Sequence, residues 1–379
     1  MTTLNIESLH PSDLAPSDLR AWREMAMIEP AFSSPLLSPD FAQAVGAVRK
    51  DARVAVIRRA GEALGFLAHH RRPGGLARPI GAPLSDYHAL VSRADLKLDA
   101  RQVLSAAGLT TFRYSGLVDP FALFGQPSQQ RTAHHIALGE AEAQTYLEAV
   151  RAASPKKIKN WRRLSNKLER EVGVIGLRAP DASPGAFEQL IAWKRAQLQR
   201  TGVHDFLGPD WTRALMADLF SRRDGPLQGL MINLYAGDQH IGGHFGVRAG
   251  EVYHPWIAST NPAYADWSPG QIFFLQAIAA MPALGLKLYD LGPGHDHYKG
   301  AYALSQVLIG EGAASASNMG GRLANSLDGI WALAGAEGAG SVGKLRRRMD
   351  AIASVELTLG GRVRGLASAV TSHAQRLAG

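Results

Sequence analysis

The pattern of apolar and polar residues predicts short strands that turn back at glycines. One pair of strand-like runs flanks Gly61 in the first half of the chain, and a second pair flanks Gly237 in the second half. The runs cover residues 53–57 and 64–67, and then residues 230–235 and 241–245. Two such runs joined by a glycine turn are typical of a β-hairpin. We therefore predict one hairpin in each half.

A helical pattern follows each hairpin and stops at a glycine. It covers residues 95–107 before Gly108 and residues 271–284 before Gly285, and an apolar run comes after each glycine. From the turn glycine to the helix-stopping glycine there are 47 positions in the first half and 48 in the second. This matched spacing predicts an internal duplication.

The second half also contains three predicted helices, at residues 155–171, 184–201 and 209–221. Each begins at a Ser-Pro or Gly-Pro pair, which supplies a capping residue or a proline for the first turn. Helices, then antiparallel strands, then a helix and a returning strand make an α+β fold. After residue 315 the chain is rich in Gly, Ala and Ser, and we predict amphipathic helices at residues 326–336 and 342–359. These helices either pack on the second half or lie on an anionic membrane surface.

Composition narrows the class of protein. A chain of 379 residues with 46% hydrophobic content has room for about two domains. The absence of Cys excludes disulfides, thiolate nucleophiles and cysteine zinc sites, and it fits a reducing cytoplasm. We find no signal-peptide pattern and no window near the roughly 18 apolar residues of a membrane span, so we expect a cytoplasmic protein. No motif supports a serine hydrolase, an NTPase or a dehydrogenase.

The net charge of +8 is concentrated in two basic clusters. The first comprises Lys156, Lys157, Lys159, Arg162, Arg163, Lys167 and Arg170, and the second comprises Lys344, Arg346, Arg347 and Arg348. Each cluster is either a solvated helix face or a surface that meets an anionic partner.

Ionisable side chains gather in the loop after the last predicted strand of the second half. This loop contains Asp290 at the strand end, then His295, Asp296, Tyr298 and Lys299. Asp290 either caps the following turn or acts on a substrate. The consecutive residues His295, Asp296 and His297 lack a further metal ligand at a suitable spacing, so we predict no metal site.

Three segments of the chain resemble the GCN5-related (GNAT) acyltransferases, and most closely the CelD/BcsL-type acetyltransferases of cellulose and exopolysaccharide biosynthesis. They are the basic helix at residues 155–171, the run Tyr264-Ala265-Asp266-Trp267-Ser268-Pro269-Gly270, and the segment from Asp290 to Lys299. The tandem layout also resembles the FemABX peptidyltransferases. The chain departs from standard GNAT enzymes in having Ser268-Pro269-Gly270 where they have an arginine- and glycine-rich pyrophosphate loop.

The resemblance implies two tandem GNAT-like domains, each a mixed, mostly antiparallel sheet flanked by helices. The first domain, residues 1–142, is expected to be non-catalytic, and the acyltransferase domain covers residues 143–315. Residues 316–379 form a helical or partly flexible basic tail. The implied donor is an acyl-CoA such as acetyl-CoA.

A helix N-terminus is a suitable site for the pyrophosphate of such a donor, because its N–H groups and its dipole favour an anion. The expected donor-binding residues are Ser268, Pro269, Gly270, Gln271 and Ile257. Ser268 would cap the helix, and Gly270 would let the ligand approach the backbone. The same tripeptide also fits a plain capped helix.

Acyl transfer needs a deprotonated nucleophile, a stabilised oxyanion and a protonated leaving group. Asp296 or His295 is the candidate base, Tyr298 the candidate acid and Lys299 the candidate charge stabiliser. Alternatively, Tyr298 is an ordinary core ring, and Lys299 pairs with Asp296 or Asp290 to fix the loop.

The expected acceptor-binding residues are Asp290, His244, His254 and Trp256. Strand alternation places His254 and Trp256 on one face, which either lines the acceptor pocket or belongs to the core.

We expect an acyltransferase that modifies a small-molecule or lipid-linked glycan acceptor in exopolysaccharide synthesis. One alternative takes its acyl group from an aminoacyl-tRNA, in which case binding would weaken steeply with salt. The other is a non-enzymatic assembly factor that contacts a membrane or a polysaccharide synthase through the basic clusters.

Overall fold

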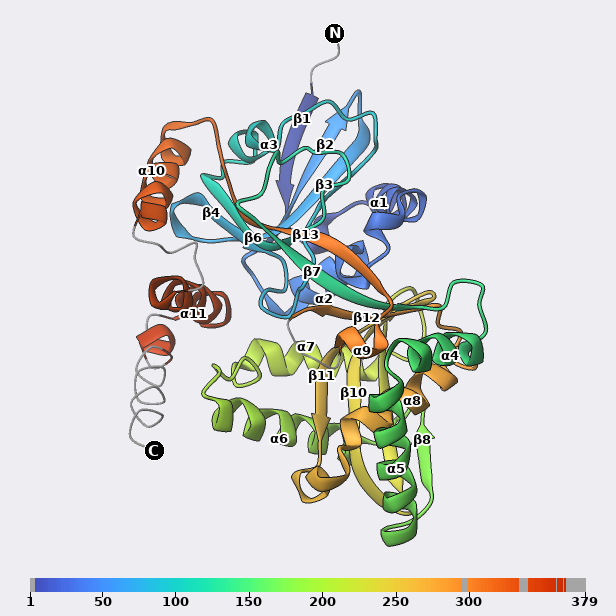
Figure 1. Cartoon of the computed structure of the whole chain (residues 1–379). Coiled ribbons are helices and arrows are strands. Elements are labelled where there is room, and N and C mark those ends of the chain that lie inside the picture. Colours follow the sequence, from blue (N-terminus) through green and yellow to red (C-terminus); the bar gives the residue numbers. More distant parts are fainter. Residues whose placement is uncertain (1–3, 295–298, 334–339, 359, 364, 366–379) are drawn as a thin grey trace. The chain divides into compact units, whose positions relative to one another are not determined.

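The computed structural model describes residues 4–294, 299–333, 340–358, 360–363 and 365 (Figure 1). The chain divides into two compact units. The first unit comprises Met1–Arg131, Gly202–Leu215 and Ile309–Gly379, and the second comprises Thr132–Thr201 and Met216–Leu308. Both units are discontinuous in sequence, whereas the predicted domains are contiguous segments; the predicted boundaries at residues 142 and 315 stay predictions.

The first unit contains a twisted, mixed sheet with the strand order β1-β2-β3-β4-β6-β13, and β5 pairs with β3. The strands are β1 (Leu4–Leu9), β2 (Ala52–Arg59), β3 (Glu62–Arg71), β4 (Leu76–Pro79), β5 (Leu90–Ser92), β6 (Thr111–Leu117) and β13 (Ser305–Ser315), whose residues from Ile309 on belong to this unit. All pairs are antiparallel except β4 with β6. The predicted first hairpin is β2 with β3.

Helices and short 3₁₀ turns cover this sheet. The helices are α1 (Pro16–Ile28), α2 (Pro39–Val48), α3 (Ala100–Ala106), α10 (Met319–Leu333) and α11 (Ser341–Val355), and the turns are η1 (Pro11–Asp13), η2 (Pro30–Phe32), η3 (Pro35–Leu37) and η4 (Pro73–Gly75). Proline opens many of them because its fixed φ suits a first turn. The core includes Trp22 of α1, which stacks on Phe66 of β3 with ring centroids 4.9 Å apart.

The second unit contains a sheet with the corresponding order β8-β9-β10-β11-β12-β7. The strands are β7 (Gln129–Ala137), which belongs to this unit from Thr132 on, β8 (Ile175–Arg178), β9 (Gln228–Ala236), β10 (Gln239–Ala249), β11 (Val252–Thr260) and β12 (Leu288–Pro293). Again one pair is parallel, β11 with β12, and the others are antiparallel. The two units therefore repeat one order of strand pairings.

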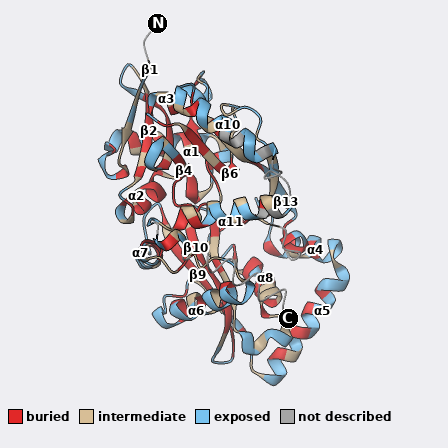
Figure 2. Ribbon diagram, turned by 90° about the vertical axis from the view of Figure 1, so that its left-hand side faces the viewer, coloured by how far each residue is buried: buried red, intermediate tan, exposed pale blue. Residues whose placement is uncertain are grey.

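The helices of the second unit are α4 (Ala143–Ala153), α5 (Pro155–Glu171), α6 (Pro184–Thr201), α7 (Asp210–Ser221, from Met216 on), α8 (Pro269–Ala280) and α9 (Lys299–Tyr302), with the 3₁₀ segment η5 (Pro262–Trp267). α5 and α6 have the predicted bounds. α5 buries Ile158, Trp161, Leu164 and Leu168 along one stripe. Most of its basic side chains are consequently exposed to solvent (Figure 2).

The duplication extends to the glycines that stop the helices. Gly108 and Gly285 have φ of 66° and 65°, a conformation that favours glycine. The N–H of the following residue returns to the helix in both units, from Leu109 to the Leu104 carbonyl and from Leu286 to the Met281 carbonyl. Only the helix lengths differ from prediction. α3 begins at residue 100, because Asp99 caps it, and α8 ends at residue 280.

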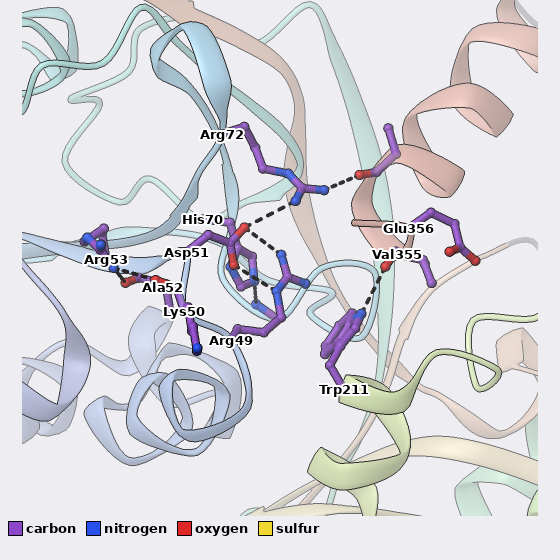
Figure 3. A network of polar contacts seen from close by, with 12 residues as sticks. Arg49, Lys50, Asp51, Ala52, Arg53, His70, Arg72, Trp211, Val355 and Glu356 are labelled. Atoms are coloured by element: carbon purple, nitrogen blue, oxygen red, sulfur yellow. Dashed lines mark hydrogen bonds and ion pairs between the residues drawn. The ribbon is translucent and has the colours of Figure 1, made fainter. Parts of the chain in front are cut away.

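The predicted tail helices correspond to α10 and α11. Their residues belong to the first unit, which corrects the expectation that they pack on the second half. The end of α11 is fixed by two carbonyl contacts (Figure 3): the Arg72 guanidinium donates to Ala353, and the Trp211 indole donates to Val355 at 3.0 Å. None of the described helices combines the length and apolar character that a membrane span requires.

A buried charge network supports these contacts to α11 (Figure 3). Arg49, which is 1% exposed, donates two hydrogen bonds to Asp51, at 2.9 and 2.8 Å, and Asp51 also accepts from Arg72. Burial raises the pKa of Asp51, but His70 and Arg49 outweigh this and hold it well below its usual range. Burial also lowers the pKa of His70 to about 4.

Candidate active site

The parallel strands β11 and β12 pair over a very short length. Val252 lies opposite Leu288 and Tyr253 opposite Tyr289, and no further pair joins the two strands among the described residues. On its other side β12 pairs with β7 from Leu288 on, with Asp290 opposite His135. We call the separation of the two strands beyond this pair the splay. It leaves backbone groups of β11 available to a ligand.

A β-bulge lies on β11 beside the splay. Phe245 of β10 pairs with Ile257, whereas Gly246 pairs with Pro255, so Trp256 is the extra residue. Glycine is required here, because a Cβ atom on Gly246 would lie 2.1 Å from the His254 carbonyl oxygen. The bulge interrupts strand alternation. The argument that alternation puts His254 and Trp256 on one face is therefore wrong.

Three neighbouring strands bring a carboxylate and two imidazoles together. Oδ1 of Asp290 on β12 lies 3.4 Å from Nε2 of His135 on β7, and Oδ2 lies 3.3 Å from Nδ1 of His254 on β11. The Gly292 N–H donates to Oδ1 at 2.8 Å, so Asp290 does fix the following turn. His254 is fully buried, and 14% of the His135 side chain is exposed. We call these three residues the His-Asp-His cluster.

The carboxylate of the cluster stays ionised at neutral pH. Burial raises the pKa of Asp290, but the nearby imidazoles of His254 and His135 outweigh it and hold this pKa well below its usual range. A buried anion of this kind can orient an imidazole and stabilise the imidazolium that forms when the ring takes a proton. Among the described residues, no group of metal-binding side chains could hold a metal ion.

His244 lies behind the splay, inside the core. A 2.6 Å hydrogen bond joins its Nδ1 to the Tyr289 hydroxyl, and its ring lies 4.2 Å from that of Phe273 on α8. Burial lowers the pKa of His244 to about 3, so the ring is neutral at physiological pH. These contacts suit a residue that positions β12 against α8; the predicted role in acceptor binding stays a prediction.

The first turn of α8 is open. Ser268 has φ 52° and ψ 56°, and its side chain makes no capping hydrogen bond, so the expected hydroxyl cap is absent. The Gln271 and Ile272 N–H groups both return to the Ser268 carbonyl, whereas the Gly270 N–H has no acceptor among the described residues. The nearest atom to a Cβ on Gly270 would be Cγ2 of Thr260, at 3.6 Å. A small side chain therefore fits there without strain.

Aromatic contacts hold the open turn in place. The Tyr302 hydroxyl of α9 donates to the Gln271 carbonyl at 2.6 Å, and its ring stacks on Trp161 of α5. Trp267, just before α8, donates its indole N–H to Glu171 at 3.2 Å, and Lys167 of α5 lies over its ring. The basic helix α5 therefore lies beside the segment that leads into α8.

The predicted catalytic loop is only partly described. His295, Asp296 and Tyr298 lie outside the described residues. Lys299 opens α9, is 8% exposed, and donates from Nζ to the Pro293 carbonyl at 3.0 Å. That contact ties together the two ends of the loop, in line with a loop-fixing role.

Sequence reasoning did not single out His135. The only local signal was a second histidine beside it, His134, in the polar strand β7. Of the predicted residues, the structure brings His254 and Asp290 together. Ile257 is buried on β11 opposite Phe245, at the far side of the bulge.

Comparisons with known proteins bear on the fold. Residues 155–300 match the model of the Acetyltransferase (GNAT) domain. The crystal structure of FemX has a TM-score of 0.53 at 11% identity, with 85% of this chain and 99% of that chain covered. The chain therefore has a tandem GNAT-like fold, as predicted, and its residues 155–300 are similar to the Acetyltransferase (GNAT) domain.

Two other solved structures are similar at lower scores. The C-terminal domain (DUF2156) of a putative lysylphosphatidylglycerol synthetase from Agrobacterium fabrum has a TM-score of 0.47 at 11% identity, with 82% of this chain and 95% of that chain covered. A tandem GNAT protein from the clavulanic acid biosynthesis pathway has a TM-score of 0.46 at 11% identity, with 83% and 99% covered. No curated protein matches the chain.

Proposed function

We propose that the second unit is an acyltransferase that moves an acyl group from an acyl-CoA, such as acetyl-CoA, to an amine or hydroxyl. The observation that carries this proposal is the open N-terminus of α8, which follows the strand that splays from β12. An uncapped N-terminus attracts the donor pyrophosphate. The GNAT domain match at residues 155–300 supports an acyl-CoA donor.

In this proposal the donor thioester lies between β11 and β12. The acceptor nitrogen or oxygen attacks the thioester carbonyl carbon, a new C–N or C–O bond forms, and the C–S bond breaks. The acceptor proton goes to a base, and the departing sulfur of CoA takes a proton. His135 suits the role of base, because its imidazole is partly exposed and is oriented by the buried Asp290 carboxylate. The loop residues Asp296 and Tyr298 remain the predicted alternative base and acid.

We further propose that the acceptor is a sugar or glycan precursor of exopolysaccharide synthesis, as the CelD/BcsL-type resemblance implies. It would be a small molecule or a lipid-linked glycan. A cytoplasmic location fits the donor, and the exposed basic face of α5 would let the protein contact the inner membrane surface or a synthase.

Calorimetric titration with acetyl-CoA tests the donor. We expect saturable binding by the wild-type chain and at least about tenfold weaker binding by Gly270→Val, whose branched side chain would cover the Gly270 N–H. Gly270→Ala is the matched control for the loss of glycine, because a Cβ there meets only Thr260. Equal affinity in wild type and Gly270→Val would exclude the α8 N-terminus as the phosphate site.

The exposed basic face of α5 favours one second candidate, a transferase that uses an aminoacyl-tRNA. Phosphate contacts of that kind would make binding fall steeply with salt. Titration with aminoacyl-tRNA at two salt concentrations, alongside acetyl-CoA, separates the two donors. A chain that binds neither donor would be the non-enzymatic assembly factor.

A further inference from the structure

The first unit contains a cavity of about 520 Å³. Its walls come from β4, β6 and β13, from residues 82–86 after β4, from Ser128 and the start of β7, and from α10 and α11. This volume is in the range of small-molecule sites and far exceeds the space that a single ion needs. Nothing in the acyltransferase proposal uses it.

The cavity is lined by an excess of arginine. The basic residues are Arg78, Arg113, Arg131, Arg346 and Arg347, and the acidic ones are Asp86, Glu311 and Asp350. Guanidinium groups match phosphate and carboxylate oxygens in pairs of parallel hydrogen bonds. Between them lie neutral polar groups that suit hydroxyls, namely those of Ser85, Ser115, Ser128 and Gln129. The lining therefore favours an anion that also carries hydroxyl groups.

The duplication gives this cavity a counterpart. In the first unit Ala77 and Phe112 form the last parallel pair between β4 and β6, and Arg78 and Arg113 come next. In the second unit Tyr253 and Tyr289 form the last pair. His254 and Asp290 follow them, so they hold the positions of the two arginines. The same place on the repeated sheet is thus a polar site in both units, with different chemistry.

A carboxylate of the chain already lies on these arginines. Asp350 of α11 accepts from Arg78 at 2.7 Å, and its other oxygen lies 4.0 Å from Nε of Arg113. One third of the Asp350 side chain remains exposed. Asp350 therefore occupies the position that a ligand anion would take, and it would compete with that anion.

The wall formed by α11 does not depend on Asp350. Its C-terminal end is fixed by Arg72 and by Trp211, through the carbonyls of Ala353 and Val355 (Figure 3). Arg348 also donates to the Gly202 carbonyl at 2.9 Å. Neutralising Asp350 should leave the helix in place.

We propose that this cavity binds a small phosphorylated polyol, such as a sugar phosphate. Its phosphate would contact Arg113 and Arg131, and Asp350 would weaken its affinity by competition. The hydroxyl groups of the ligand would meet the serine and glutamine side chains of the lining. The proposal is independent of acyl transfer, since every group it uses belongs to the first unit.

Calorimetric titration of the full chain with α-D-glucose 1-phosphate, inorganic phosphate and glucose tests the site. We expect glucose 1-phosphate to bind more tightly than inorganic phosphate, and glucose not to bind. Arg113→Gln should weaken binding by about tenfold or more, because it removes a charge-assisted contact, and Asp350→Asn should tighten it several-fold.

Two control variants make the result specific. Arg93→Gln changes an exposed arginine of the same unit that pairs with Glu62 and Asp95 away from the cavity lining, and it should not alter binding. Ser268→Asp changes the α8 site in the second unit and should also leave glucose 1-phosphate binding intact. Circular dichroism melting of each variant checks that it folds.

Three results would overturn the proposal. The first is no binding of glucose 1-phosphate by wild type and by Asp350→Asn. The second is inorganic phosphate that binds as tightly as glucose 1-phosphate, which would indicate an anion site without polyol recognition. The third is binding that Ser268→Asp abolishes and Arg113→Gln does not, which would locate the phosphate at α8.

Discussion

The two units share one sheet topology but differ at the helix that follows the hairpin. In the first unit the N-terminus of α3 is capped. The Asp99 carboxylate accepts from the Arg101 N–H at 2.8 Å, and the Leu123 carbonyl accepts from the Ala100 N–H at 2.9 Å. Gln102 completes a capping box with Asp99. In the second unit α8 has no side-chain cap. A duplicated scaffold can thus keep its fold while only one copy keeps an uncapped helix N-terminus at this position.

The units also differ in the charge that each places beyond its parallel strand pair. The first unit has Arg78 and Arg113 there, held on Asp350. The second unit has Asp290 held between two imidazoles. Arginine cannot take up or release a proton near neutral pH, whereas an imidazole can. The difference favours ligand binding in the first unit and proton transfer in the second.

The largest effect should come from Asp290→Asn, which removes the charge that orients His135. We expect acetyl transfer to fall by about 100-fold, in line with the loss of general base catalysis. The melting temperature should fall, because the folded chain stabilises this carboxylate, although the amide oxygen can still accept from Gly292, so rates are compared per folded molecule. Steady-state rates with acetyl-CoA measure this.

A matched control is Asp238→Asn, the same substitution in the exposed turn between β9 and β10. It should leave the rate unchanged. If Asp290→Asn were as active as this control, proton transfer would not depend on the His-Asp-His cluster. The assignment of proton transfer to this position of the second unit would then be wrong.

A smaller effect should appear in the pH dependence of stability, and both units should share it. Burial lowers the pKa of His69 in the first unit to about 4 and that of His244 in the second to about 3. Below pH 6.5 these histidines take up protons in the unfolded chain but stay neutral in the folded chain. The free energy of unfolding therefore falls as the pH decreases toward 4.

Each of these two histidines should lower the free energy of unfolding by about 2 kcal/mol between pH 7.5 and pH 5. His69→Gln and His244→Gln should each reduce the acid-induced loss by about that amount, as measured from urea unfolding curves at the two pH values. An unchanged pH dependence in either variant would show that its ring accepts a proton in the folded state.

The smallest effect should come from giving α8 the acidic cap of α3. Ser268→Asp places a carboxylate at the first turn, and aspartate tolerates the left-handed conformation that Ser268 adopts. We expect about tenfold weaker acetyl-CoA binding from repulsion of the donor phosphates. Ser268→Asn has the same shape without the charge and should weaken binding less; equal losses in both variants would contradict an electrostatic cause.

Much of the fold could be read from local signals. The bounds of α5 and α6 follow from prolines at their starts and from apolar residues at helical spacing, as observed. The glycine spacing predicted the duplication. The bulge at Trp256 could not be read in the same way, because it depends on the approach of β10 to β11 at Gly246.

Local sequence patterns could not predict which strands pair with β7 and β13. β7 follows β6 in the sequence but pairs with β12, and β13 follows β12 but pairs with β6. Each sheet is therefore completed by a strand from outside its own run of sequence. For this reason His135 was missed, whereas Asp290 and His254 were found.

The sequence by itself determined the helices, the hairpins and their repetition, because proline, glycine and apolar spacing act on the backbone within a few residues. Only the tertiary structure decided which polar groups meet. His135 joins Asp290 and His254, and Asp350 joins Arg78 and Arg113, through pairings between segments far apart in the chain. Their chemistry depends on burial and on distances of a few ångströms, which no local pattern specifies.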